Sequence, residues 1–150
     1  MGPWTVRAAV VSILQARAGL QTPETLVRLG LPPQEPAKAL TRRVYVIAET
    51  APEQETPEYQ SGNQIPQDVF AIPIACYALA YNSEPDGSAV EAMISELVGE
   101  LQDQVLADNQ WGGVCVASGL TLSAESTRPL SSGDGWQAGA ALNLHIKTLG

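Results

Sequence analysis

Lysine and arginine are absent from the middle of this chain. Among its 150 residues, 16 are acidic and 8 are basic, so the net charge is −8. Residues 44–127 hold thirteen of the acids and no basic residue, whereas residues 1–43 carry six basic residues against two acids. Binding to a phosphate backbone needs clustered cations, so we expect no specific nucleic-acid binding. The acidic middle fits either a solvated surface or a functional electrostatic field.

Groups that bind metals or act as nucleophiles are also scarce, with two Cys and one His. The separation of Cys76 and Cys115 matches no zinc motif, and we expect both to be reduced and buried. No phosphate-binding glycine loop, nucleophile elbow or H-E-x-x-H motif occurs. We therefore predict no catalytic, cofactor-binding or metal site and no enzyme. The alternative is a small hydrolase or ligand-binding domain that pairs Cys115 with His145 across neighbouring strands.

Long hydrophobic runs are missing as well. The most apolar uncharged run, residues 69–83, contains Pro73 and is shorter than the ~20 apolar residues of a membrane-spanning helix. The start of the chain lacks the basic region and cleavage site of a secretory signal. The length suits a single domain over residues 1–150. We expect a soluble protein made in the cytoplasm, with no membrane partner.

Helical periodicity is present in three segments. Residues 4–18 show an apolar stripe, and residues 88–107 form the clearest amphipathic pattern in the chain. Ser88 and Glu91 have the spacing of a capping box at the start of the helix predicted at residues 88–107. Residues 22–30 begin with Thr-Pro and end with Gly, which predicts a short additional helix.

Strand periodicity covers residues 44–48, 68–81, 114–122 and 136–147. Trp111-Gly112-Gly113 predicts a chain break before the third of these segments, which has an irregularity at Ser118-Gly119. The segment 68–81 is apolar on both faces, which indicates burial on both sides. One face would pack against the rest of the domain, and the other fits either the same domain or a neighbouring subunit. Pro73 cannot donate to a ladder, so we expect an edge or a bulge there. Together the elements predict an α+β fold: a mostly antiparallel four-stranded sheet with two or three helices packed on one face.

A polar segment at about residues 50–65 interrupts the predicted strands. It is acidic and rich in proline, and loops longer than ~12–15 residues are usually functional or disordered. We predict a long flexible loop that serves as a contact arm. The candidate interface residues are Arg42, Arg43, Glu53, Glu55, Glu58, Tyr59 and Trp136.

Several short motifs occur in an order found in one family. They are the Val6–Val11 helix, the Arg43–Val46 strand, the acidic loop before the strand 67–80, the helix 88–107, the pair Gly112-Gly113 and the Gly135-Trp136-x-Ala138-x-x-x-Leu142 segment. In this order the chain resembles the tail terminator proteins of long-tailed phages, the minor tail protein U family. The resemblance covers most of the chain, and the order of the motifs carries most of its weight.

The resemblance implies a structural virion protein with no catalytic activity. It implies a weakly associating domain that forms a homohexameric ring on the head-proximal end of the tail tube, ends tube polymerisation and offers a surface for head joining. The implied partners are its own copies, the tail tube protein and the head–tail connector or neck protein, after assembly in the host cytoplasm. DNA would pass through an acidic lumen without specific binding. The alternative within assembly proteins is another neck or head–tail joining protein, such as a stopper.

Overall fold

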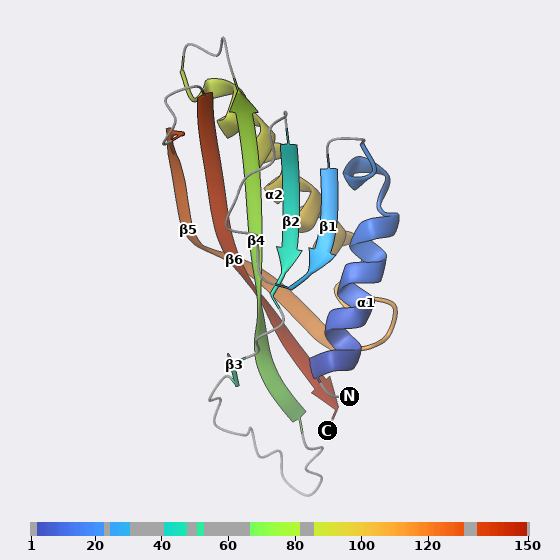
Figure 1. The fold of residues 1–150 in the computed structure, drawn as a ribbon. Coiled ribbons are helices and arrows are strands. Elements are labelled where there is room, and N and C mark those ends of the chain that lie inside the picture. Colours follow the sequence, from blue (N-terminus) through green and yellow to red (C-terminus); the bar gives the residue numbers. More distant parts are fainter. Residues whose placement is uncertain are drawn as a thin grey trace, which may run out of the picture.

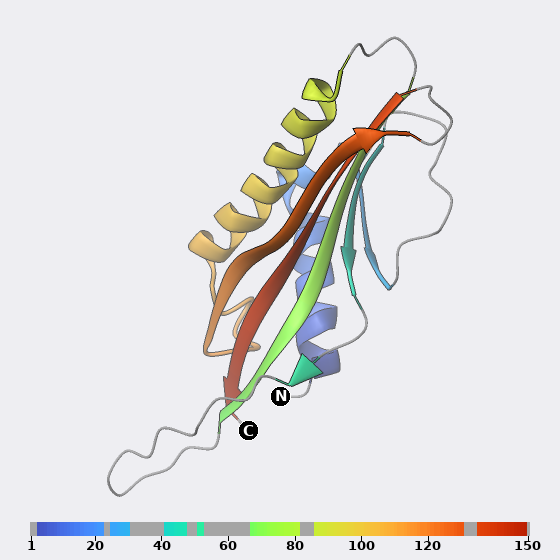
Figure 2. The same cartoon turned by 90° about the vertical axis from the view of Figure 1, so that its left-hand side faces the viewer.

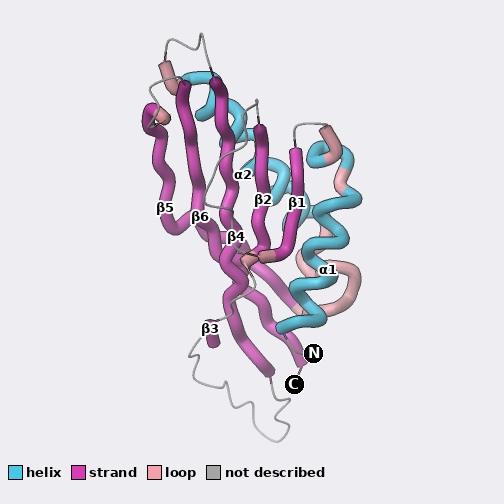
Figure 3. The backbone as a smooth tube through the Cα atoms, viewed as in Figure 1, coloured by secondary structure: helices cyan, strands magenta, loops and turns pink. Residues whose placement is uncertain are grey.

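The fold is that of a computed structural model, which describes residues 3–22, 25–30, 41–47, 51–52, 67–81, 86–130 and 135–149. The described residues form two α-helices beside a strongly twisted sheet (Figures 1 and 3). The elements in chain order are α1 (Pro3–Ala16), the 3-10 turn η1 (Ala18–Leu20), β1 (Thr25–Leu29), β2 (Thr41–Val46), β3 (Ala51–Pro52), β4 (Gln67–Tyr81), α2 (Ser88–Ala107), β5 (Ala117–Pro129) and β6 (Gly135–Leu149).

The sheet has the strand order β1-β2-β4-β6-β5, and the short β3 pairs with β4 outside this path. β1 runs parallel to β2, and every other neighbouring pair is antiparallel. The α+β class is therefore confirmed. The prediction of four mostly antiparallel strands is partly wrong, because the path contains five strands and one parallel pair.

The additional strand lies in the segment for which we predicted a second short helix. Residues 25–29 form β1, and the three-residue turn η1 ends at Leu20, before the predicted helix would begin. Thr25 and Val27 are buried, whereas Leu26 and Arg28 between them are exposed. Val27 lies opposite Val44 of β2, and β-branched side chains suit such a half-buried pleated surface. Pairing with β2 therefore overrides the local helix signals.

β4 is the central strand, with β2 on one side and β6 along its full length on the other. Its even-numbered side chains from Phe70 to Ala80 are buried, whereas most odd-numbered ones are half-buried. We predicted burial on both faces of this strand. One face is fully buried, and the other is only partly buried. Pro73 lies just past the last β2–β4 pair, where Ile47 N donates to Pro73 O over 2.9 Å. Pro73, which has no N–H to donate, lies between the end of β2 pairing at Ile74 and the start of β3 pairing at Ala71, so β4 has a local break in its ladder on this side.

α2 covers the face of the sheet on which the even-numbered side chains of β4 lie (Figure 2). Its buried residues are Val90, Ile94, Leu97, Leu101 and Gln104. The four apolar residues of this set join Val6, Val10 and Leu14 of α1 in a single core cluster with the sheet. The amphipathic helix predicted at residues 88–107 is therefore confirmed with the same bounds.

The predicted capping box at the start of α2 is wrong. The N-cap residue is Gly87, and no side chain there caps the helix. Instead, Asp86 Oδ1 accepts hydrogen bonds from Ser88 N at 2.9 Å and Ser88 Oγ at 2.5 Å. These bonds lower the pKa of the Asp86 carboxyl, because they favour its charged form. A carboxylate near a helix N-terminus is also favourable toward the helix dipole.

Two ion pairs tie α2 to other elements. Arg17 Nε donates to Glu100 Oε2 at 2.5 Å, and Arg17 Nη1 donates to Gln104 Oε1 at 3.0 Å. Arg42 on β2 pairs with Glu96. Because Arg17 directly follows α1 and Arg42 lies on β2, these contacts hold α2 against both elements.

β5 and β6 form the last hairpin, and β5 extends to Pro129, well beyond the predicted end at residue 122. The irregularity that we placed at Ser118-Gly119 lies instead between Leu122 and Ala124. Ser123 is the extra residue there, and its Oγ donates to Ala141 O at 2.9 Å. A one-residue bulge reverses the side-chain alternation, so odd-numbered residues of β5 beyond it face α2.

The chain turns between α2 and β5 through Trp111-Gly112-Gly113. All three residues have positive φ, at 49°, 73° and 93°. Asp108 accepts hydrogen bonds from Gln110 N and Gly112 N, and so holds the turn from the helix end. The predicted chain break at this motif is confirmed.

A Gly113→Ala substitution should destabilise the fold by about 1 kcal/mol. A Cβ at this position meets nothing within 4 Å, so its effect isolates the strain of the positive φ. The matched control is Gly99→Ala in α2, where a Cβ also meets nothing and no positive φ occurs. That variant should gain roughly 0.5–1 kcal/mol from helix propensity. Urea denaturation measures both, and equal effects would contradict the strained turn.

Candidate interaction surfaces

The two faces of the sheet differ in charge. We call the face opposite α2 the open face. Among the described side chains it carries Arg28, Arg43, Arg128, His145 and Lys147 and no acid. The described acids lie in or beside α2 or on the α2-facing side of β5: Asp86, Glu91, Glu96, Glu100, Asp103, Asp108 and Glu125. The charge asymmetry along the sequence thus becomes an asymmetry between faces.

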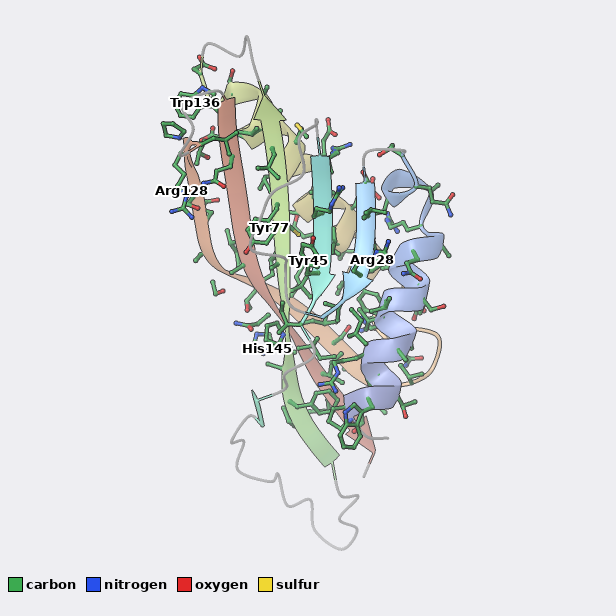
Figure 4. The ribbon with its side chains drawn as sticks, in the orientation of Figure 1. Arg28, Tyr45, Tyr77, Arg128, Trp136 and His145 are labelled. Atoms are coloured by element: carbon green, nitrogen blue, oxygen red, sulfur yellow. The ribbon has the colours of Figure 1, made fainter. Side chains whose placement is uncertain are left out.

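Aromatic side chains occupy the middle of the open face. Tyr45 and Tyr77 stand on the neighbouring strands β2 and β4 (Figure 4). Their ring centroids are 6.1 Å apart with an interplanar angle of 66°, an edge-to-face pair. Arg43 is the register partner of Tyr77, so a cation lies beside the pair. Figure 4 also shows Arg28 and Arg128 on strands at opposite edges of the sheet.

A groove of about 630 Å³ lies between α2 and β5 on the other face. Ala138 and Ala140 of β6 line it with small buried side chains. Apolar side chains from α2 and β5 also line it: Ile94, Val98 and Leu122. Two exposed acids, Glu91 of α2 and Glu125 of β5, lie along it. The groove therefore combines an apolar lining with negative charge.

One end of the groove is tightly packed. Thr127 Oγ1 donates to Glu91 Oε1 at 2.9 Å and so links β5 to α2. A Cβ at Gly87 would come within 2.6 Å of Thr127 Cγ2 and 3.2 Å of Trp136 Cε3. Glycine at position 87 thus permits the close approach of the helix start to the hairpin.

The predicted interface residues do not form one cluster. Arg42 faces α2, its side chain is 11% exposed, and its buried Nε has no hydrogen-bond partner. Arg43 lies on the open face, where its Nη1 donates to Arg42 O at 3.0 Å. Trp136 is half-buried beside Gly87. The remaining candidates, Glu53, Glu55, Glu58 and Tyr59, belong to the loop at about 50–65 and lie outside the described residues.

The structure does not bring Cys115 and His145 together as a reactive pair. Cys115 is a free thiol within the core cluster, and its Sγ contacts Asn109 O at 3.4 Å. His145 lies on the open face, where its Nε2 hydrogen-bonds Thr121 Oγ1 at 2.8 Å. Burial, followed by the nearby Asp108 carboxylate, raises the pKa of Cys115. An activated nucleophile would need the opposite shift.

Both native thiols should therefore resist modification. Burial raises the pKa of Cys76 to about 12, so this thiol stays protonated at neutral pH. At pH 8 we expect a thiol-specific chromogenic reagent to label each Cys at least about tenfold more slowly in the folded protein than in urea. Rapid labelling of Cys115 in the folded protein would contradict this and favour the Cys/His hydrolase alternative.

Comparisons with protein-family models and with curated proteins return no relative for this chain. No protein-family model matches the sequence, and no curated protein is detectably similar to it. Within the described residues, no helix has the length and apolar character to cross a membrane. The same part of the chain contains no cluster of three or more His, Cys, Asp or Glu side chains suited to a metal ion. What the fold defines is thus an α+β domain with two chemically different sheet faces and one apolar, acidic groove.

The surface features that sequence reasoning missed are the groove and Arg28. Both depend on elements that were misplaced, because Arg28 belongs to β1 and the groove depends on the extension of β5. The sequence does contain a signal for β1: Thr25 and Val27 alternate with Leu26 and Arg28, and such alternation is typical of a strand.

Proposed function

We propose that the protein caps the head-proximal end of a phage tail tube as a homohexameric ring, where it ends tube polymerisation and provides the surface for head joining. The support is the order of elements that carries the resemblance to tail terminator proteins. A long apolar strand, an amphipathic helix, a glycine turn and a final strand follow one another in that order as β4, α2, residues 111–113 and β6.

A second source of support is the distribution of exposed apolar surface. Large exposed hydrophobic side chains occur on four separate elements, namely Trp4, Leu26, Leu29, Leu106 and Leu122. A ring subunit that contacts two neighbours, a tube end and a neck protein needs several separate contact surfaces. We therefore assign these side chains to contacts with other subunits rather than to one ligand site.

The electrostatic part of the proposal concerns the lumen. Genome passing through the ring would be repelled by an acidic wall, and the described acids gather around α2. In the ring, α2 would therefore face the lumen and the cationic open face would face outward. The predicted loop at about 50–65 would contact the tube, and this contact would become stable when many copies bind together.

Tube polymerisation tests the proposal. Purified tube protein of the same phage is allowed to polymerise with and without this protein, and tube length is followed by light scattering. We expect growth to stop early when the protein is added. Unchanged growth, combined with capture of a portal-side adaptor instead of the tube protein, would favour a stopper or another neck protein. Unchanged growth with neither partner bound would contradict the proposal.

A further inference from the structure

One row of side chains crosses the entire sheet on the face that packs against α2. In register, the row consists of Leu29, Val46, Ile74, Leu142 and Leu122, on β1, β2, β4, β6 and β5. Its three middle members are at most 2% exposed, whereas Leu29 is 52% exposed and Leu122 is 50% exposed. The row is therefore buried in the centre and open at both edges of the sheet.

The two open ends carry opposite charge. At the edge strand β1, Leu29 points to the α2 side, whereas the exposed Arg28 and the partly exposed Leu26 point to the open face, so the three side chains flank the same edge. Beside Leu122 lies the groove with its acids Glu91 and Glu125. The ion pairs within the described residues are Arg17–Glu100 and Arg42–Glu96. Arg28, Glu91 and Glu125 belong to neither pair, so a cationic apolar patch and an acidic apolar groove both remain available for an intermolecular contact.

These two surfaces cannot meet within one chain. Four strand intervals separate β1 from β5, and at about 4.8 Å each the edges are roughly 19 Å apart. Contact between them requires a second copy. We infer that this second copy occupies the groove. The patch and the groove carry opposite charges, and each has an exposed leucine that can pack against the other.

We propose that the β1 patch (Leu26, Arg28 and Leu29) of one copy docks into the groove between α2 and β5 of the next copy. This inference rests on the ring proposed above, and it names the two surfaces that build the ring. Because the surfaces differ, the contact is heterologous, and repetition around an axis closes a ring. The groove of about 630 Å³ admits only a few side chains, which suits a weak contact that becomes stable when several copies assemble on a tube.

The docking uses side chains rather than continued strand pairing. Gln15 Nε2 of α1 donates to Val27 O of β1 at 3.0 Å. The side chain from α1 thus takes up a backbone carbonyl of β1 that another strand would otherwise need for pairing. A symmetric contact between two β5 edges is disfavoured, because the bulge at Ser123 and the terminal Pro129 interrupt the backbone groups available for pairing. It would also bring two acidic grooves together.

Cysteine cross-linking tests the contact. Leu29→Cys and Leu122→Cys are introduced singly and together, and the proteins are oxidised with copper phenanthroline at high concentration and on tail tubes. A disulfide needs Cα atoms within about 7 Å, so no bond can form between residues 29 and 122 of one folded chain. We expect the double variant to give a ladder of covalent oligomers and each single variant to stay monomeric. The native Cys76 and Cys115 are buried in every variant.

Charge exchange provides the second arm. A Leu29→Cys chain and a Leu122→Cys chain are mixed, and their cross-linked dimer is quantified. Arg28→Glu in the first chain should lower the yield roughly tenfold, and Glu125→Arg in the second should restore much of it. The matched controls are Lys147→Glu on the open face and Asp103→Arg on α2, neither of which belongs to the patch or lines the groove. Both should leave the yield unchanged.

Each outcome decides between the two proposals. Rings seen on tubes without a 29–122 ladder would overturn the docking surfaces and leave the proposed function intact. Dimers from Leu122→Cys alone would also overturn them, in favour of a symmetric β5 contact. A ladder with no ring on tubes would support the docking surfaces and overturn the proposed function. Absence of both would overturn both.

Discussion

Trp111→Ala should cost about 3–5 kcal/mol in the free energy of unfolding, among the largest effects of any substitution in the described chain. The Trp111 side chain is 1% exposed and belongs to the core cluster. Its Nε1 donates to Ser118 Oγ at 3.0 Å, and Ser118 Oγ donates in turn to Asn109 O at 2.7 Å. The indole therefore connects the turn after α2 to the start of β5. Urea denaturation followed by far-UV circular dichroism measures the loss.

Trp4→Ala is the matched control for this substitution. Trp4 is 79% exposed on α1, so removing its side chain should change stability by no more than about 0.5 kcal/mol. Trp111→Phe keeps the packing but loses the donor, and it should fall between the two. A stability loss in Trp4→Ala as large as that in Trp111→Ala would contradict the assignment of Trp111 to the core.

Leu142→Ala should cost about 2–5 kcal/mol, whereas Leu122→Ala should cost about 1 kcal/mol or less. These leucines are direct partners across the β5–β6 ladder and face the same side of the sheet. Leu142 is 2% exposed, whereas Leu122 opens into the groove. Thermal and urea unfolding of the two variants compare them directly. Equal losses would mean that Leu122 belongs to the core of the monomer and not to a contact surface.

The long elements could be predicted from the sequence because their hydrophobic periods are sustained. β4, α2 and β6 each extend over 15 residues or more. An error of a few residues at one end therefore leaves most of the element correctly assigned. β1 has only five residues, and the Thr22-Pro23 and Gly30 signals around it resemble helix boundaries. Its parallel pairing with β2 is a tertiary contact that local propensity does not encode.

The candidate surfaces depend on a detail that periodicity could not locate. The bulge at Ser123 shifts the alternation of β5, which turns Glu125 and Thr127 toward α2 and leaves Arg128 on the open face. The sequence prediction placed the irregularity at Ser118-Gly119 and ended the strand at residue 122. It therefore assigned no face of the sheet to the residues beyond 122. The charge count along the chain was correct, but the separation of acids and cations between faces follows from strand register.

Direct imaging of tube ends tests the central claim of a ring-forming tail cap. Tail tubes of the same phage are assembled with the protein and examined by electron microscopy, with two-dimensional averaging of both ends. We predict one six-fold ring on one end of each tube, with α2 toward the lumen, and bare ends when the protein is omitted. Tubes with two bare ends in the presence of excess folded protein would contradict the account.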